Sequence, residues 1–220
     1  MTQAAKSGRI GLVPRRKRLI IAGQAHLVRQ RLWRWFSADR QVSAYLRVLR
    51  AAFARRGVQV RAWSALPDAV HFVLVPPRIG ALGTALAEAN GLYGRWRNRV
   101  DGARGPVFRR RFECCAVDRE WLLEAARLVE RLPVIAYIVD HPIAWEDSSA
   151  RYNAGLLPED RLAAGPPLDE EVADWMEWLR HGEFERERRL FDALDSGRPV
   201  GGRRWRGRVA IAARKKLRTL

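Results

Sequence analysis

The sequence has little cysteine and no long apolar run. Its two cysteines, Cys114 and Cys115, are adjacent, and neighbouring residues rarely reach the geometry of a disulfide bond. This disfavours a disulfide-stabilised secreted fold and fits a reducing compartment. No apolar run approaches the ~20 residues that a membrane-spanning helix needs, and residues 1–11 lack the apolar centre of a secretory signal. We therefore expect a soluble, cytoplasmic protein with no membrane partner.

Acidic residues are also scarce. The chain of 220 residues has 24 aspartates and glutamates against 41 lysines and arginines, which gives a formal net charge of +17. Such a balance attracts polyanions, and arginine matches phosphate with a planar fork of donors. A genome rich in G and C would also favour arginine, but it would not explain the excess of basic over acidic residues. The charge predicts a nucleic-acid partner and a protein associated with the nucleoid.

The charge is distributed unevenly along the chain. Residues 1–157 hold 27 basic and 12 acidic residues, residues 158–195 hold 5 and 12, and residues 196–220 hold 9 and none. We predict a folded domain over 1–157, an acidic helical extension over 158–195 and a basic tail over 196–220 that can touch phosphate. The acidic part can either fold back on the basic body or form a solvated helix.

Hydrophobic spacing predicts an α+β fold. Helices are expected where apolar residues recur at three and four positions, and strands where β-branched and aromatic residues cluster. The expected elements are a strand within 19–30, a helix over 39–56, strands over 58–63 and 70–75, a helix over 81–99, a strand within 107–117, a helix from 118 that ends before Pro133, and one helix over 170–195. The first six follow the ferredoxin-like split βαβ plan, an antiparallel sheet with helices on one face.

One segment carries a specific pattern. Residues 62–75 read AWSALPDAVHFVLV. This resembles the signature of IS200-like tyrosine transposases, especially those associated with repetitive extragenic palindromes (REP), in which a strand ends in Met-Pro-Asn and the next opens with His-hydrophobic-His. Other segments resemble that family in the same order, namely residues 14–31, 39–57, 92–98, 105–112, 132–136, 145–152 and 196–201. The resemblance covers roughly residues 14–157 and touches the tail.

The resemblance implies a partner and a reaction. The partner is single-stranded or hairpin DNA, and the reaction is attack of a tyrosine on a phosphodiester to give a 5′-phosphotyrosine and a free 3′-hydroxyl. Tyr93 matches the family nucleophile. In the family the two histidines hold a divalent ion, Mg²⁺ or Mn²⁺, that polarises the scissile phosphate.

The metal motif departs from that pattern. Only the second histidine is present, as His71, because Ala69 stands at the position of the first. A single imidazole is a poor site for a divalent ion, since selective binding needs several converging ligands. Asp68 and Asn98 are the candidates to complete the set, and otherwise the protein uses no metal. Arg97, one turn after Tyr93, cannot serve as a ligand.

Two of these residues have a structural alternative. His71 lies in an apolar strand, where a histidine is often a hydrogen-bonded core residue. Tyr93 shares a helix face with Leu82 and Leu86, so it can be a core aromatic instead of a nucleophile. A phenol with a pKa near 10 also needs a metal or a cation to become nucleophilic at neutral pH.

The candidate DNA contacts are basic residues of the matched segments. They are Arg15, Arg16, Lys17, Arg18, Arg29, Arg31, Arg95, Arg109, Arg110 and Arg111. Tryptophans also lie among arginines, a mixture that suits base stacking beside phosphate contacts. These are Trp33, Trp35, Trp96 and Trp205.

Three functions remain open from the sequence. The first is a transposase-like protein that binds single-stranded or hairpin DNA with nicking impaired or lost. The second is an active metal-dependent tyrosine transposase or nuclease. The third is an RNA-binding or partner-binding protein that retains only the fold. The sequence leaves both a monomer and a homodimer open.

Overall fold

The computed structural model describes residues 18–168, 172 and 174–217, with side chains as far as residue 211. Its first six elements follow the predicted order. They are β1 (Ala25–Arg31), α1 (Asp39–Arg56), β2 (Gln59–Ala65), β3 (Ala69–Val75), α2 (Ala81–Val100) and β4 (Glu113–Val117). The four strands form one antiparallel sheet in the order β2-β3-β1-β4. This confirms the α+β class and the ferredoxin-like plan.

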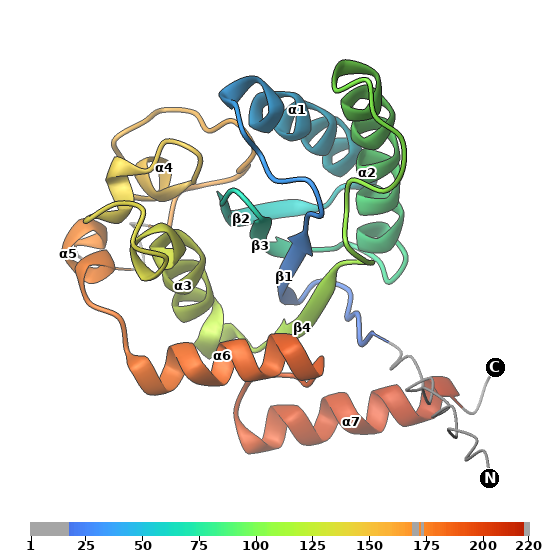
Figure 1. The fold of residues 1–220 in the computed structure, drawn as a ribbon. Coiled ribbons are helices and arrows are strands. Elements are labelled where there is room, and N and C mark those ends of the chain that lie inside the picture. The colour runs from blue at the N-terminus through green and yellow to red at the C-terminus, as the bar shows by residue number, and fades with distance from the viewer. Residues whose placement is uncertain (1–17, 169–171, 173, 218–220) are drawn as a thin grey trace, which may run out of the picture.

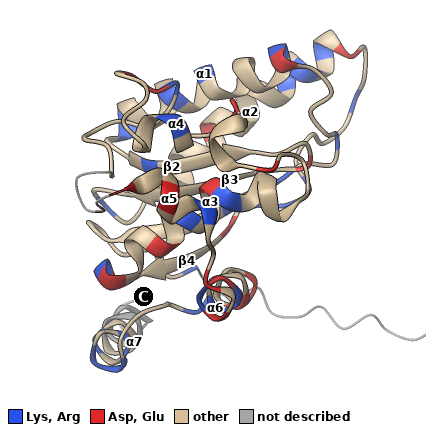
Figure 2. Ribbon diagram, turned by 90° about the vertical axis from the view of Figure 1, so that its left-hand side faces the viewer, with Lys and Arg blue, Asp and Glu red and all other residues tan. Residues whose placement is uncertain are grey.

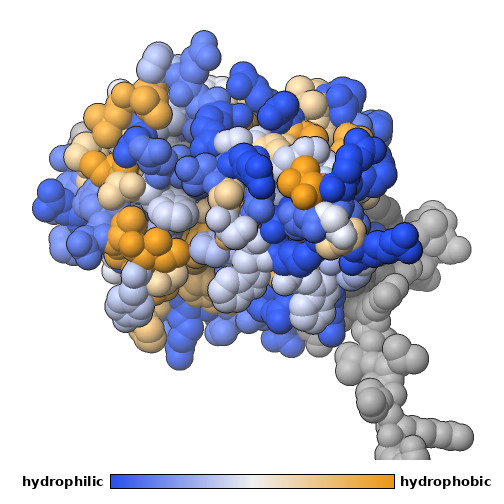
Figure 3. Space-filling view, turned by 45° about the horizontal axis from the view of Figure 1, so that its top comes forward, coloured by the Kyte–Doolittle hydropathy of each residue, from blue (hydrophilic) through white to orange (hydrophobic). Residues whose placement is uncertain are grey.

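Helices α1 and α2 cover one face of the sheet (Figure 1). Val42, Tyr45 and Leu49 of α1 are buried, as their spacing predicts. Gly57 ends α1 at the predicted place, because its φ of 65° is a left-handed conformation that glycine adopts without a Cβ penalty. Seen from this side, the surface is mostly hydrophilic, and hydrophobic residues gather toward the α4 flank (Figure 3).

The opposite face of the sheet is also covered. Helices α3 (Leu122–Ile135), α5 (Trp175–Arg180) and α6 (Phe184–Ser196) share a hydrophobic cluster with strand residues such as Leu27, Val73 and Cys115. The prediction of helices on one face therefore holds for α1 and α2 only. Short connecting elements complete this side, namely η1 (Arg119–Trp121), η2 (Pro142–Ala144) and α4 (Ala150–Asn153).

Some predicted boundaries are wrong. The strand expected within 107–117 is confirmed and occupies Glu113–Val117, but the third helix does not end before Pro133 and continues to Ile135. A proline inside a helix removes one N–H donor, and its ring crowds the carbonyl group of residue i−4, so Pro133 weakens this last turn, and the helix ends two residues later. The single helix expected over 170–195 is two helices, α5 and α6, because the chain leaves the helical conformation at residues 181–183.

The segment that we expected to form a basic tail contains a further helix. Helix α7 (Arg203–Leu217) lies next to α6 in Figure 1. Its Trp205 and Val209 pack with Ala116 of β4. Within the ranges that the structure describes, no helix is both long and apolar enough to cross a membrane.

Candidate nucleic-acid interface

Tyr93 lies on the face of α2 that packs against the sheet and α1. Only 1% of its surface is exposed, and its ring contacts a cluster of aromatic side chains. The ring centroids nearest to it belong to Tyr45 at 4.9 Å, Trp96 at 5.5 Å, Phe108 at 5.9 Å and Phe36 at 6.2 Å. This environment favours the core-aromatic interpretation of Tyr93.

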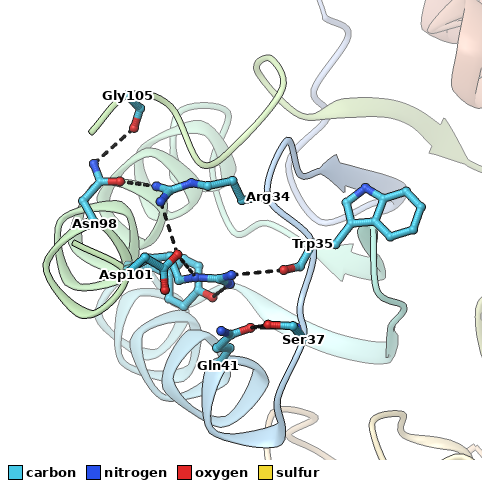
Figure 4. Close-up of polar contacts among 9 residues, drawn as sticks. Arg34, Trp35, Ser37, Gln41, Asn98, Asp101 and Gly105 are labelled. Atoms are coloured by element: carbon cyan, nitrogen blue, oxygen red, sulfur yellow. Dashed lines mark hydrogen bonds and ion pairs between the residues drawn. The ribbon is translucent and has the colours of Figure 1, made fainter. Parts of the chain in front are cut away.

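The hydroxyl of Tyr93 accepts a hydrogen bond from Arg97 Nη1 at 3.2 Å. Arg97 is held in turn by Asp101 Oδ2 at 2.6 Å and by the carbonyl oxygen of Trp35 at 3.1 Å. Figure 4 shows this polar network at the end of α2. Burial raises the pKa of Tyr93, and the hydrogen bond and charge of Arg97 only partly oppose that shift. The phenol is therefore a weaker nucleophile at neutral pH than a free tyrosine.

His71 points to the other face of the sheet. In β3, Val70 and Phe72 belong to the core under α1 and α2, so His71 between them faces the side of α3 and α6. Tyr93 belongs to the core on the α1 side. The sheet therefore separates these two side chains within one chain.

The other two predicted ligands also lie apart. Asp68 is an exposed residue before β3, and its backbone oxygen accepts a hydrogen bond from Leu32. Asn98 accepts a hydrogen bond from Arg34 and donates one to the carbonyl oxygen of Gly105 at 3.1 Å (Figure 4). The structure thus does not bring Tyr93, His71, Asp68 and Asn98 into one site.

The surroundings of His71 decide whether it could hold a divalent ion. Burial, followed by the charges of Arg29 and Arg31, lowers its pKa to about 3, so the imidazole is neutral. Its Nδ1 is buried and makes no hydrogen bond with a described residue. The two neighbouring guanidinium groups repel a cation, however, and no group of three His, Cys, Asp or Glu side chains in the described ranges could hold a metal. The residues present do not fit Mg²⁺ or Mn²⁺.

Arginines gather at the edge of the same sheet face. A pocket of about 370 Å³, here called the arginine pocket, opens where β1 ends and the segment before β4 passes it. Seven residues line this pocket, namely Arg29, Arg31, Trp33, Arg109, Arg110, Arg111 and Glu113. The structure therefore brings together five of the ten predicted DNA contacts, from two segments about 80 residues apart in sequence.

The backbone explains how the two segments meet. The amide of Trp33 donates to the carbonyl oxygen of Val107 at 2.8 Å, and the amide of Arg109 donates to that of Arg31 at 3.0 Å. Residues 109–111 thus run beside the end of β1 without belonging to a strand. A loop in this position leaves its side chains free to reach a ligand.

Two carboxylates partly neutralise the pocket. Arg29 Nε donates to Glu113 Oε2 at 2.5 Å, and Arg29 Nη2 pairs with Asp195 at the end of α6. The acidic segment therefore does fold back on the basic body. Sequence reasoning missed both Glu113, which lines the pocket, and Asp195, which pairs with Arg29. For Asp195, the charge contrast between the acidic segment and the basic body was a usable signal. Arg109, Arg110 and Arg111 form no ion pair with a described residue, so the pocket retains a net positive charge.

Two tryptophans of the segment after β1 are exposed, and Trp33 also lines the pocket. Trp33 is 54% exposed and Trp35 is 62% exposed, which is unusual for such large apolar side chains. The guanidinium of Arg109 lies over the ring of Trp33, 4.5 Å from its centroid. Trp96 and Trp205, by contrast, pack against the body of the protein. Of the four tryptophans named for base stacking, Trp33 and Trp35 have a free ring surface.

The remaining predicted contacts are scattered. The guanidinium of Arg18 lies 4.2 Å from the ring centroid of Phe112, the residue that directly follows the three arginines 109–111 in the sequence. Arg95 is exposed on α2, outside the residues that line the pocket. Arg15, Arg16 and Lys17 lie outside the described residues.

Comparison with known proteins supports the fold. No protein-family model and no curated protein sequence matches the chain. A solved structure of a REP-associated tyrosine transposase bound to a REP hairpin is similar, with a TM-score of 0.55. The two chains are 18% identical, and the match covers 70% of this chain and 92% of the other. The chain therefore has the fold of the REP-associated tyrosine transposases.

Proposed function

We propose that the protein binds DNA that is single-stranded or folded into a hairpin, through the arginine pocket, and that it does not nick this DNA through Tyr93. The observation that carries the proposal is the pocket itself, where five arginines surround one exposed tryptophan. Guanidinium groups bind phosphate oxygens, and an indole ring stacks on an unpaired base. The similar transposase is bound to a REP hairpin, which makes a hairpin the first ligand to test.

The placement of the residues supports the absence of nicking. A nucleophile must reach the phosphate, and Tyr93 is buried among aromatic rings with a raised pKa. The side chain of His71 is on the opposite face of the sheet from Tyr93, beside two arginines instead of a second histidine. The arginines can hold a phosphate in place, but they do not supply a nucleophile to attack it.

Binding can be tested by fluorescence anisotropy on a labelled hairpin with a single-stranded flank. The variant Arg109→Ala/Arg110→Ala/Arg111→Ala should bind about tenfold or more weakly, because three charge-assisted phosphate contacts are lost. A matched control is Arg40→Ala/Arg47→Ala/Arg50→Ala, which removes the same charge from exposed positions of α1. We expect the control to bind within about threefold of the wild type, since it changes only the long-range field. Equal losses in the two variants would contradict a specific pocket.

Nicking can be tested on the same hairpin. The protein is incubated with the labelled hairpin and Mg²⁺ or Mn²⁺, and a denaturing gel should show no covalent adduct. An adduct that Tyr93→Phe abolishes would refute the proposal about catalysis. An RNA hairpin of the same sequence serves as a further competitor, and a clear preference for RNA would refute DNA as the ligand.

A further inference from the structure

Helix α7 is attached to the sheet by its own backbone contacts. Val200, three positions before the helix, forms an isolated parallel β-bridge with Val117 of β4. Its amide donates to the carbonyl oxygen of Ala116 at 2.9 Å, and its carbonyl oxygen accepts from the amide of Asp118 at 2.8 Å. These bonds fix the chain at the edge of the sheet immediately before the helix begins.

The next residues pack tightly against the same place. A Cβ at Gly201 would lie 2.6 Å from Asp118 Cβ and 2.6 Å from Trp205 Cε3, so only glycine fits there. Trp205 and Val209 are one helical turn apart and both are buried, in a cluster with Ala116. Helix α7 is therefore held in a defined position and is not a loose basic tail.

The exposed surface of α7 is basic. Four exposed arginines surround the narrow buried stripe of Trp205 and Val209, and no ion pair joins them to a described residue. They are Arg203, Arg204, Arg206 and Arg208. Helix α7 contains no acidic residue, and Figure 2 shows it as a helix with basic positions and no acidic ones, in contrast to α6. Four unpaired guanidinium groups over less than two turns create a strong local attraction for phosphates.

We infer that α7 is a second DNA-binding element, which contacts the phosphate backbone of a double-stranded stem next to the arginine pocket. The inference rests on the proposed function and specifies its ligand as DNA with a paired stem as well as an unpaired part. Both surfaces adjoin the edge strand β4, because Glu113 lines the pocket on one face of that strand and Ala116 contacts α7 on the other. The two residues are about 10 Å apart along β4, so a duplex that passes this edge of the sheet can meet both surfaces.

Two observations favour a duplex over other polyanions. Trp205 is buried, so α7 presents arginines without a free aromatic ring, and it can grip phosphates but cannot stack on unpaired bases. Trp205 and Val209 are buried against Ala116 and the residues before β1, so Ile211 is the only large apolar side chain that the described part of α7 could insert into a lipid surface. A regular backbone of phosphates is the partner that such a surface fits.

The length of α7 determines how long a DNA stem must be to contact the whole helix. Its 15 residues span about 22 Å, which corresponds to about 6 base pairs at 3.4 Å each. Hairpins with identical flanks and loops, and with stems of about 4 or about 12 base pairs, should therefore differ in affinity for the wild type. We expect the long stem to bind about tenfold more tightly, with a steeper salt dependence.

The charge variant is Arg203→Gln/Arg204→Gln/Arg206→Gln/Arg208→Gln. We expect it to bind the long stem no better than the short one, and to retain the affinity of the wild type for the short stem. Its matched control changes four exposed arginines elsewhere, namely Arg40, Arg47, Arg50 and Arg78, to glutamine. The control should keep the preference for the long stem.

Gly201→Ala tests the position of α7 without altering its charge. The added Cβ meets Asp118 and Trp205, so the start of the helix must shift away from β4, and the preference for the long stem should fall while every arginine remains. Retained affinity for the short stem shows that the pocket is still folded. A long-stem preference that survives in Gly201→Ala and in the charge variant overturns the inference.

Two further outcomes separate this inference from others. In one outcome, the pocket variant loses binding to the short stem, while the α7 charge variant binds both stems as the wild type does. This outcome supports the proposed function and overturns the role of α7. If the wild type binds phosphatidylglycerol vesicles, and the α7 charge variant loses that binding while it keeps the preference for the long stem, α7 is a lipid-binding surface and the inference is wrong. If the wild type binds neither hairpin at low salt, the proposed function itself fails.

Discussion

Glu130 on α3 is a fully buried carboxyl group, and its titration offers a sharp test of the packing on the α3 side of the sheet. It accepts hydrogen bonds from Ser149 Oγ at 2.6 Å, Asn153 Nδ2 at 2.6 Å and Trp175 Nε1 at 2.9 Å. It therefore ties α3 to α4 and α5. Burial raises the pKa of Glu130 from 4.5 to about 7, although the three hydrogen bonds oppose that shift.

The sign of the pH dependence follows from that shift. Between pH 4.5 and about 7 the folded protein holds a proton on Glu130 that the unfolded chain has lost. The stability linked to this proton is present below pH 4.5 and is lost as the pH rises through about 7. One pKa unit corresponds to about 1.4 kcal/mol, so the change between pH 5 and pH 8 is roughly 2 to 3 kcal/mol.

The variant Glu130→Gln removes this proton equilibrium. Relative to the wild type, it should gain roughly 2 to 3 kcal/mol in free energy of unfolding between pH 5 and pH 8, as measured by urea denaturation. The comparison between proteins is necessary because His26 and His71 shift the wild-type curve the opposite way. Burial lowers their pKa values to about 4 and about 3, so the stability that they contribute is lost as the pH falls below 6.5.

The difference between the two curves isolates Glu130. Glutamine also loses one acceptor for Trp175 Nε1, but that loss shifts the curve by a constant amount and leaves its slope unchanged. The exposed Glu159→Gln serves as the control for the removal of one surface carboxylate. If the difference between Glu130→Gln and the wild type is the same at pH 5 and pH 8, the reasoning about the buried carboxyl is wrong.

Three further predictions concern the core and the pocket. Tyr93→Phe should lower the free energy of unfolding by about 1 kcal/mol, through loss of one hydrogen bond, and should leave hairpin affinity unchanged; a large loss of affinity would show that the phenol reaches DNA. Cys114 and Cys115 are buried with pKa values raised to about 12, so neither thiol should react with a chromogenic disulfide reagent until urea unfolds the chain. Asp195→Asn should bind the hairpin about threefold more tightly, because a carboxylate that competes with phosphate is removed; unchanged or weaker binding would count against phosphate contact at Arg29.

The sequence predicts the ferredoxin-like core well because its signals are local. The apolar spacing of residues 39–56 and the left-handed Gly57 define α1, and the β-branched run at residues 70–75 defines β3. The misplaced boundaries depend on tertiary contacts instead. Helix α3 continues through Pro133, in part because Leu128 and Leu132 are packed in the cluster below the sheet, and no local pattern reports that packing.

The site was harder to predict than the fold. Periodicity places His71 and Tyr93 on the buried faces of their elements, but it does not say which side of the sheet each face meets. That information comes from topology. The arginines of residues 109–111 were assigned to DNA from their charge and from the segment that resembles the transposase family, and their meeting with Arg29 and Arg31 depends on a loop that pairs with the end of β1.

The charges beside His71 bear on what this fold can do with a phosphate. Arg29 and Arg31 supply positive charge next to the imidazole, as a divalent ion would, and either arrangement attracts a phosphate. A metal ion also polarises the phosphorus and can lower the pKa of a bound hydroxyl, whereas a guanidinium offers fixed donors and stays protonated. Tyr93 is on the opposite face of the sheet. If the proposed function holds, this arrangement of arginines favours retention of a DNA strand over its cleavage.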